Sequence, residues 1–183
     1  MTHTPITLYL IGFAGSGKYT IAKEIAKIAD YKIVDNHLIN NPIFSLLDLS
    51  DDKPIPMVAW MAICAIRKAV LHFVSIDYEH NYVFTNELLK HDVTTYEQVQ
   101  DCAKMRESLF VSVKLVISPE EHRKRIVNIG RKERFKSTNI AEIESGKELI
   151  DIDHRNALTL DITHLTAEQA AREILDFVQN LNK

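Results

Sequence analysis

The sequence predicts an α/β fold in a single domain, with a parallel sheet covered by helices on both faces. Segments with the pattern of a strand and segments with the pattern of a helix alternate along the chain. The strand-like segments are short, continuous apolar runs, which are typical of strands buried on both faces. The chain has 183 residues, 46% of them hydrophobic, and contains no repeat or Gly/Ser-rich linker. One core of ordinary size is therefore expected to serve residues 1–183.

The spacing of apolar residues defines the elements of the first half. We expect a strand at 6–11, a helix at 18–29, a strand at 32–34 and a helix at 57–76. The segment after Asp35 is polar and contains Pro42, Pro54 and Pro56, so it is interpreted as a loop. The longest uninterrupted apolar run of the last helix is ten residues, whereas a membrane span needs about 20. We therefore expect a buried helix in a soluble protein.

Capping residues mark the elements of the second half. Strands are expected at 82–85, 111–117 and 157–161, and helices at 95–107, from 118 onward and from 166 onward. Ser118, followed by Pro119 and Glu121, gives an N-cap, a proline at the first helical position and a glutamate at the third. Thr166 with Gln169 forms a second capping box. The helix at 95–107 has only a thin apolar stripe, so it is expected to lie mostly exposed.

Composition and charge exclude several classes of protein. The formal net charge of −3 gives no overall attraction to nucleic acid or to an anionic membrane. Two cysteines, Cys64 and Cys102, are too few for a disulfide framework, and both are interpreted as buried free thiols. The first five residues are polar and resemble no signal peptide. These observations favour a cytoplasmic protein without a nucleic acid or membrane partner.

A cluster of glycines points to phosphate binding. Three of the five glycines fall within residues 12–17, and residues 12–18 (GFAGSGK) match the Walker A pattern G-x-x-x-x-G-K between a strand and a helix. Glycines let backbone N–H groups approach phosphate oxygens, the helix N-terminus adds partial positive charge, and Lys18 can reach the β- and γ-phosphates. The residues expected to bind the nucleotide here are Gly12, Phe13, Ala14, Gly15, Ser16, Gly17, Lys18, Tyr19 and Thr20.

One position departs from this motif. The residue after the lysine is normally Ser or Thr, whose hydroxyl binds Mg²⁺, but here it is Tyr19. Thr20 follows, although helical geometry turns it about 100° away from position 19. Either Mg²⁺ is held by the nucleotide, water and carboxylates, or metal binding is weakened.

With these motifs the chain resembles the small P-loop kinases of the shikimate kinase and gluconate kinase group. The matching segments are residues 12–18, the SPEE helix start at 118–121 with Arg125 behind it, and TLDITHLTAEQAAREIL at 159–175. The resemblance implies a three-layer αβα sandwich with a five-stranded parallel sheet in the order 2-3-1-4-5. It also implies ATP-dependent phosphorylation of a small molecule, an arginine-bearing lid and a carboxylate after the second strand.

Polar side chains follow the second and third strands, at the edge of a parallel sheet where ligands bind. Asp35 is expected to accept a proton from a substrate hydroxyl or to help hold Mg²⁺, or else to stabilise the following loop as an Asx turn or cap. His37 is an alternative base, because imidazole titrates near neutral pH. Glu87 could supply a carboxylate to Mg²⁺, or simply start a helix facing solvent.

Two residue sets complete this interpretation. The candidate metal ligands are Thr20, Asp35 and Glu87. The candidate acceptor-binding residues are Asn36, His37, Asn86 and Glu87, with Asn40, Asn41, Trp60, Arg67 and His91 as further polar residues that could line the pocket. Nucleoside monophosphate kinases often carry an Asp-Gly-Phe-Pro-like stretch after the third strand, but residues 84–87 read FTNE here, which weighs against a nucleotide acceptor.

A basic segment is the expected lid. Residues 123–136 hold seven of the 22 lysines and arginines, and the lid is placed at about 122–146. Arg131 and Arg134 are expected to stabilise the transferring phosphoryl group, with Gly130 as the hinge. A solvated helix face or a nucleic acid contact are the alternatives, but aromatic residues do not alternate with the basic ones. By analogy with the family, Arg155 is expected to stack on adenine.

The sequence therefore supports three functions. The first is an ATP- and Mg²⁺-dependent kinase that phosphorylates a hydroxyl of a small molecule, with Lys18, Asp35, Arg131 and Arg134 as its catalytic residues. The second is a nucleotide-binding protein with weak or no kinase activity because of Tyr19, in which the long apolar helix could serve a partner or a dimer interface. The third is a nucleoside or nucleotide kinase. The chain is expected to be a monomer or a homodimer.

Overall fold

The computed structural model describes residues 4–49, 54–127 and 146–181, and it contains one five-stranded parallel sheet. The strands are β1 (Ile6–Ile11), β2 (Tyr31–Asp35), β3 (Asn81–Asn86), β4 (Leu109–Val116) and β5 (Ala157–Asp161). Their order in the sheet is β2-β3-β1-β4-β5, and all four neighbouring pairs are parallel. The predicted fold class and strand order are confirmed.

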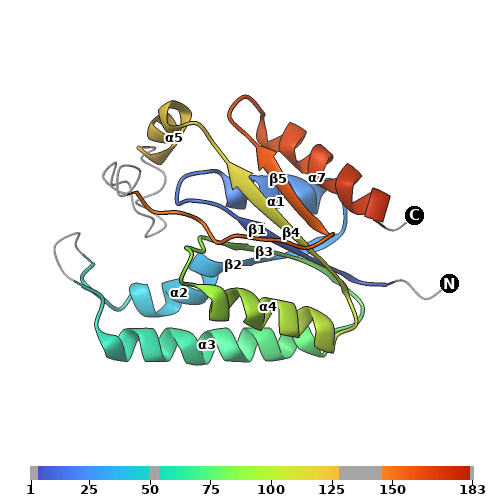
Figure 1. Cartoon of the computed structure of the whole chain (residues 1–183). Coiled ribbons are helices and arrows are strands. Elements are labelled where there is room, and N and C mark those ends of the chain that lie inside the picture. Colours follow the sequence, from blue (N-terminus) through green and yellow to red (C-terminus); the bar gives the residue numbers. More distant parts are fainter. Residues whose placement is uncertain (1–3, 50–53, 128–145, 182–183) are drawn as a thin grey trace.

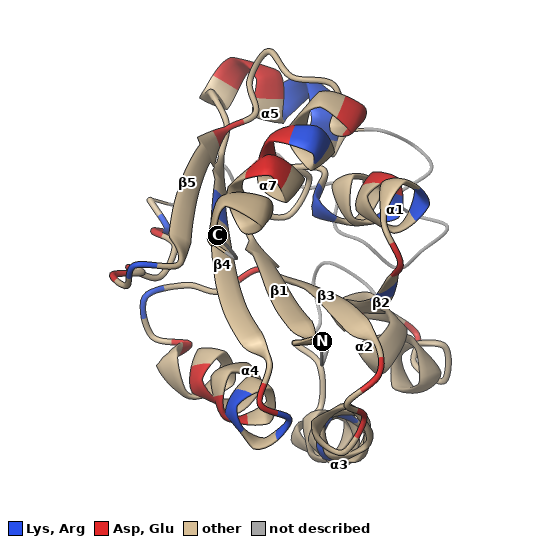
Figure 2. Cartoon of the chain, turned by 90° about the vertical axis from the view of Figure 1, so that its right-hand side faces the viewer, with Lys and Arg blue, Asp and Glu red and all other residues tan. Residues whose placement is uncertain are grey.

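Helices cover both faces of this sheet and give three layers (Figures 1 and 2). They are α1 (Lys18–Ile28), α2 (Asn36–Phe44), α3 (Met57–Ser75), α4 (Val93–Met105), α5 (Pro119–Ile126) and α7 (Ala167–Leu181). Side chains of β1 alternate between the two faces, because successive residues of a strand point in opposite directions. Leu8 and Leu10 pack in the cluster under α1 and α7, whereas Tyr9 and Ile11 pack in the cluster under α3 and α4.

The predicted capping residues act as expected. Ser118 Oγ accepts a hydrogen bond from the backbone N–H of Glu121 at 3.3 Å, and Pro119 opens α5. At α7, the N–H of Thr166 donates to Gln169 Oε1 at 2.8 Å, and the N–H of Gln169 donates back to Thr166 Oγ1 at 3.2 Å. These two pairs fix where the chain re-enters a helix after β4 and β5.

The predicted loop after Asp35 is wrong in its first part, because residues 36–44 form α2. Asp35 caps this helix by accepting a hydrogen bond from the N–H of His37 at 3.4 Å, and Ile39 and Phe44 are buried by it. Pro42 lies inside α2, where it lacks the N–H that would bond to the residue four positions earlier. The helix ends only two residues later, so the cap and the buried side chains outweigh this loss.

Helix α3 has the predicted bounds to within one residue, but the prediction that it is buried is wrong. Only Ala59, Ile63, Val74 and Ser75 are buried, and large apolar side chains point away from the sheet. Cys64 is exposed on this helix, against expectation, whereas Cys102 of α4 is buried as predicted. Among the described residues, α3 is also the one helix long and apolar enough to cross a membrane.

A buried arginine connects several elements at the edge of the sheet where the strands begin. Arg106, the C-cap of α4, is fully buried. Its Nε donates to the carbonyl of Asp77 at 2.9 Å, its Nη1 donates to Thr7 Oγ1 at 3.0 Å, and its Nη2 donates to the carbonyl of His80. The guanidinium also lies 4.8 Å from the ring centroid of Tyr82. One side chain thus joins β1, the chain before β3, and the ends of α3 and α4.

Candidate functional site

The loop at residues 12–18, called the phosphate loop below, leaves β1 and enters α1 at the edge where the strands end. The N–H of Gly12 donates to the carbonyl of Asn86 at 3.3 Å, so the loop lies directly beside the end of β3. Gly15 and Gly17 have φ angles of +87° and +98°, which favour glycine. A Cβ on Gly12 would lie 2.9 Å from Ser16 Oγ, so this position also has no room for a side chain.

Two polar side chains of the phosphate loop turn inward. Lys18 Nζ donates to the carbonyls of Gly12 and Phe13, both at 2.7 Å, and so lies folded over the loop. Ser16 is fully buried, and its Oγ has no hydrogen-bond partner in the part of the chain that the structure describes. A buried hydroxyl without a partner costs free energy. Its position in a glycine cradle with a lysine is the chemistry that fits a bound polyphosphate.

Helix α5 supports the phosphate loop from outside, and sequence analysis assigned no role to the residues that do so. His122, which is buried, donates from Nε2 to the carbonyl of Ala14 at 2.5 Å, and its ring stacks on Phe13 with centroids 6.0 Å apart. Arg125 donates to the carbonyl of Ser16 at 3.4 Å and to the carbonyl of Ile162 at 3.1 Å. His122 and Arg125 are three positions apart, so the sequence already places them on the same side of a helix.

Arg125 also borders an open pocket beside the phosphate loop. The pocket has a volume of about 220 Å³ and is lined by Gly17, Thr20, Ile21, Arg125, Ile162, Leu165, Thr166, Ala167 and Ala170. Its walls are the start of α1 and the connection between β5 and α7. Thr20 faces this pocket, and the ring of Tyr19 lies 5.4 Å from Lys23 Nζ. Thr20 thus lines the pocket one residue beyond the position where the motif normally places the metal-binding hydroxyl.

Asp35 lies on the same face of the sheet as the phosphate loop. Its neighbour two residues earlier, Ile33, packs in the cluster under α1, as does Val83 of β3. Alternation along the strands therefore directs Asp35 and Thr85 toward that same face. The Asp35 side chain is only 4% exposed, and Thr85 Oγ1 donates to its Oδ1 at 2.8 Å. Asp35 therefore acts as a cap, but of α2 rather than of a loop, and its carboxylate is held at the same edge of the sheet as the phosphate loop.

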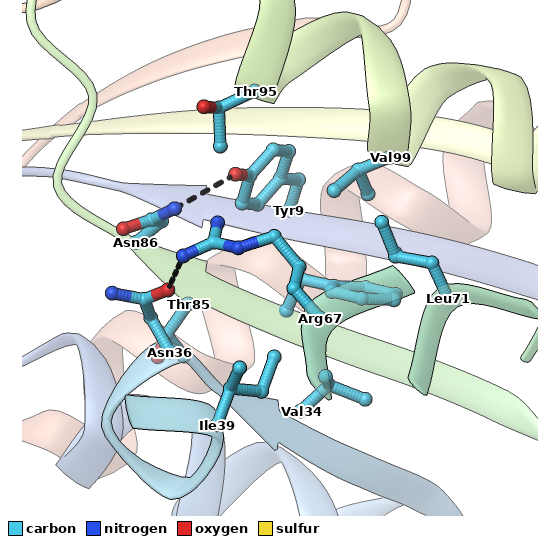
Figure 3. Close-up of a pocket in the computed structure, with 11 residues that line it drawn as sticks. Tyr9, Val34, Asn36, Ile39, Arg67, Leu71, Thr85, Asn86, Thr95 and Val99 are labelled. Carbon is cyan, nitrogen blue, oxygen red and sulfur yellow. Dashed lines mark hydrogen bonds between the residues drawn. The ribbon is translucent and has the colours of Figure 1, made fainter. Parts of the chain in front are cut away.

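A second pocket opens where β1, β2 and β3 end, on the face covered by α3 and α4 (Figure 3). It is small in this structure, with a volume of about 20 Å³, and its lining residues are Tyr9, Val34, Asn36, Ile39, Arg67, Leu71, Phe84, Thr85, Asn86, Thr95 and Val99. We call it the acceptor pocket. Thr85 contributes to this pocket and also binds Asp35, so it connects the pocket with the loop side of the sheet.

The polar wall of the acceptor pocket comes from four elements, β1, α2, α3 and β3. Arg67 Nη2 of α3 donates to Asn36 Oδ1 at 2.6 Å, and Asn86 Nδ2 donates to the Tyr9 hydroxyl at 3.4 Å, as Figure 3 shows. Burial raises the pKa of Tyr9 well above its ordinary value, so its hydroxyl stays neutral. The pocket therefore offers one fixed cation and several neutral hydrogen-bonding groups beside an apolar wall.

The other predicted site residues are not all brought to this edge. Glu87 follows Asn86 directly and so lies near the phosphate loop, whereas His37 and His91 do not line the acceptor pocket. Arg155 is exposed and precedes β5, on the side of the sheet away from the loop. Arg131, Arg134 and Gly130, with most of the lid at 122–146, lie outside the described residues. Within the described ranges, no group of three His, Cys, Asp or Glu side chains could hold a metal ion.

Solved structures with this architecture include kinases. A protein from Chloroflexus aurantiacus to which a kinase function has been ascribed has a TM-score of 0.70 and 14% identity, covering 98% of this chain and 99% of that one. A gluconokinase from Sinorhizobium meliloti has a TM-score of 0.62 and 15% identity, covering 98% of this chain and 94% of that one. The APS kinase of Mycobacterium tuberculosis, in complex with AMPPNP and APS, has a TM-score of 0.62 and 14% identity, covering 96% of this chain and 98% of that one.

These likenesses show the fold alone, because identity is low. No family model matches the chain, and no curated protein matches its sequence. The αβα fold of the P-loop kinases, which the motifs led us to expect, is thereby confirmed.

Proposed function

We propose that this chain, which has the fold of the P-loop kinases, transfers the γ-phosphate of ATP to a hydroxyl of a small molecule in the cytoplasm. One observation carries the proposal. A buried carboxylate, Asp35, is held by Thr85 at the same edge of the sheet as the phosphate loop, and Thr85 also lines the acceptor pocket. Phosphate donor, base and acceptor would thus meet at one edge of the sheet, and phosphoryl transfer depends mainly on such positioning.

The nucleotide would span the phosphate loop and the pocket beside it. Ser16 Oγ and the loop N–H groups fit the phosphates, and Lys18 would exchange its two carbonyl partners for phosphate oxygens. The nucleoside would enter the pocket between Thr20 and Leu165 rather than approach Arg155. Bound Mg²⁺ would neutralise phosphate charge, and Asp35 and Glu87, which follow β2 and β3, are its proposed carboxylate ligands.

Asp35 would act on the acceptor hydroxyl. Asp35 is the proposed acceptor of the proton that the hydroxyl loses when it attacks the γ-phosphorus, and Thr85 would hold the carboxylate in position. Asp35 also binds the N–H of His37, so the start of α2 helps to orient it. Arg131 and Arg134 remain proposed as groups that stabilise the transferring phosphoryl group.

The acceptor pocket favours an anionic, hydroxylated substrate. Arg67 has five N–H donors and, among the described residues, makes one hydrogen bond, to Asn36. Its remaining donors suit a carboxylate or a phosphate, while Asn36, Asn86 and the Tyr9 hydroxyl suit substrate hydroxyls. Sugar acids and other polyhydroxy acids are therefore the first compounds to test as acceptors.

The test is a screen for acceptor-dependent ADP release with matched acids and neutral polyols. We expect acids to be better substrates, and Arg67→Met to raise the KM for the acid roughly tenfold to a hundredfold, the effect of losing one charged hydrogen bond. Lys68→Met, which removes an exposed charge one residue away on α3, is the matched control and should leave this KM unchanged. The proposal fails if no hydroxylated acceptor of either class accelerates ADP release.

Tyr19 supports a second candidate, a nucleotide-binding protein with little kinase activity. The residue places an aromatic ring, lying against Lys23, where a metal-binding hydroxyl is usual. For a kinase, we expect Mg²⁺ to enlarge the ATP-induced rise in melting temperature, and Tyr19→Ser to enlarge it further. Thermal shift with ATP or ADP, each with and without Mg²⁺, measures both effects. A rise that is equal with and without Mg²⁺ in both proteins would favour the second candidate.

A further inference from the structure

The outer face of α3 is apolar where a surface helix is normally charged. Its residues Met57, Met61, Ala65, Ala69 and Phe73 follow one another at four-residue intervals and so form a single row along the helix. Met57 is 75% exposed, Met61 67% and Phe73 61%, and both alanines are exposed. Val58, beside this row, is 73% exposed. The opposite side of α3 already packs on α2 and α4 (Figure 2).

This face is large enough for a specific interface. Met57, Val58, Met61 and Phe73 are each more than 60% exposed, and together they present on the order of 500 Å², within the range of the largest apolar patch on a typical monomer. Two such faces together would bury about 1,000 Å², the area that a biological interface needs when its surfaces are complementary. A patch of this size on a monomer usually marks a binding site.

We propose that two copies of this chain pair through the outer face of α3, antiparallel about a twofold axis at Ala65. In this arrangement each residue meets the one equally distant from Ala65 on the other side. Met61 then packs against Ala69 of the second copy, and Met57 packs against Phe73 of the second copy. Ala65 meets Ala65 of the second copy, and this small pair lets the two helices approach closely at the centre. The row is therefore complementary to itself.

The charges on α3 favour a second copy over a lipid bilayer. Arg67 and Lys68 lie at the middle of the helix, where a membrane span would place both charges at the bilayer centre, the most costly depth for them. Arg67 is also bound to Asn36 on the inner side, so insertion would break the acceptor pocket. In the pair, Lys68 lies at the edge of the interface, where its long side chain can reach water.

The first test is the mass of the full chain in solution by sedimentation velocity. We expect a species of about twice 20.9 kDa. Ala65→Glu places two like charges together on the axis, so it should raise the dimer dissociation constant roughly a hundredfold or more. Gln98→Glu adds the same charge to the exposed side of α4 and should leave the dimer intact. Circular dichroism of each variant shows whether it is folded.

Cross-linking at Cys64 tests the geometry of the pair. Cys64 is exposed and lies one residue from the axis, so a bismaleimide spanning about 10 Å should link it to Cys64 of the second copy. The variant Cys64→Ser with Met57→Cys should not link to itself, because sixteen residues of helix rise separate the two sites by about 24 Å. Cys102 is buried and should not react.

Three results would overturn the proposal. One is a wild-type monomer at concentrations of tens of micromolar. Another is a dimer that Ala65→Glu leaves intact while the protein stays folded. The third is a monomer that co-sediments with vesicles of phosphatidylcholine and phosphatidylserine, which would assign the outer face of α3 to a membrane surface. None of these measurements uses kinase activity, so they stand apart from the proposed function.

Discussion

Asp35→Asn is expected to lower kcat for acceptor phosphorylation by roughly 10²–10⁴-fold, the usual contribution of a general base. Asparagine has the same shape, and its Oδ1 can still accept the hydrogen bonds from Thr85 Oγ1 and from the N–H of His37. It remains a good helix N-cap, so α2 should start as before. What the variant lacks is the capacity to take up a proton. The dissociation constant of ATP should change little, because the phosphate loop is untouched.

The measurement is steady-state ADP release with the best acceptor, together with ATP binding by calorimetry. Asp30→Asn is the matched control, because Asp30 is an exposed acid five residues earlier that forms only a surface ion pair with Lys32. Its kcat should equal that of the wild type. If Asp35→Asn retains full kcat while Asp30→Asn behaves as expected, Asp35 is a structural cap, and the base must be sought elsewhere.

Arg106→Met is expected to reduce the free energy of unfolding by about 3 kcal/mol or more. Methionine fills most of the space but donates no hydrogen bond, so the carbonyls of Asp77 and His80 and the hydroxyl of Thr7 lose a buried donor. Each unpaired buried group costs about 1–3 kcal/mol. The contact between the guanidinium and the Tyr82 ring is lost as well. Burial lowers the pKa of Arg106, and this desolvation cost, removed in the variant, offsets part of the loss.

Urea unfolding of Arg106→Met and Arg172→Met measures this difference. Arg172 forms an exposed ion pair with Glu168 at 2.7 Å, and such pairs contribute about 0–1 kcal/mol. If the two variants lose the same stability, the buried hydrogen bonds of Arg106 do not hold the edge of the sheet together. The phosphate loop lies at the opposite edge, so ATP binding by folded Arg106→Met should be close to that of the wild type.

Local patterns were enough to predict the sheet. Each strand is a short apolar run, and the helices after β4 and β5 carry capping residues whose bonds depend only on neighbours three positions away. The same local reasoning placed Gly12 to Lys18 and Asp35 at one edge, because parallel strands end together. It failed at α2, because the sequence shows Pro42 as a helix breaker. The cap and the two buried side chains that stabilise the helix become visible only in the fold.

Features that depend on distant contacts could not be predicted. The sequence of α3 is apolar on both sides, and periodicity alone does not say that one side would remain uncovered. Arg106 ends an ordinary amphipathic helix, and its partners lie 26 to 99 residues away in the chain. His122 and Arg125 resemble any exposed residues of a basic helix until α5 is seen against the phosphate loop.

Arg125 has a consequence for how the site would receive a nucleotide. Its guanidinium donates to the carbonyl of Ser16 in the phosphate loop and to the carbonyl of Ile162 in the wall of the adjoining pocket, and its Nε donates to Glu121 Oε1 at 2.8 Å. Arg125 therefore ties the loop to the pocket wall before any ligand enters. We expect the proposed nucleotide to bind without displacing this wall.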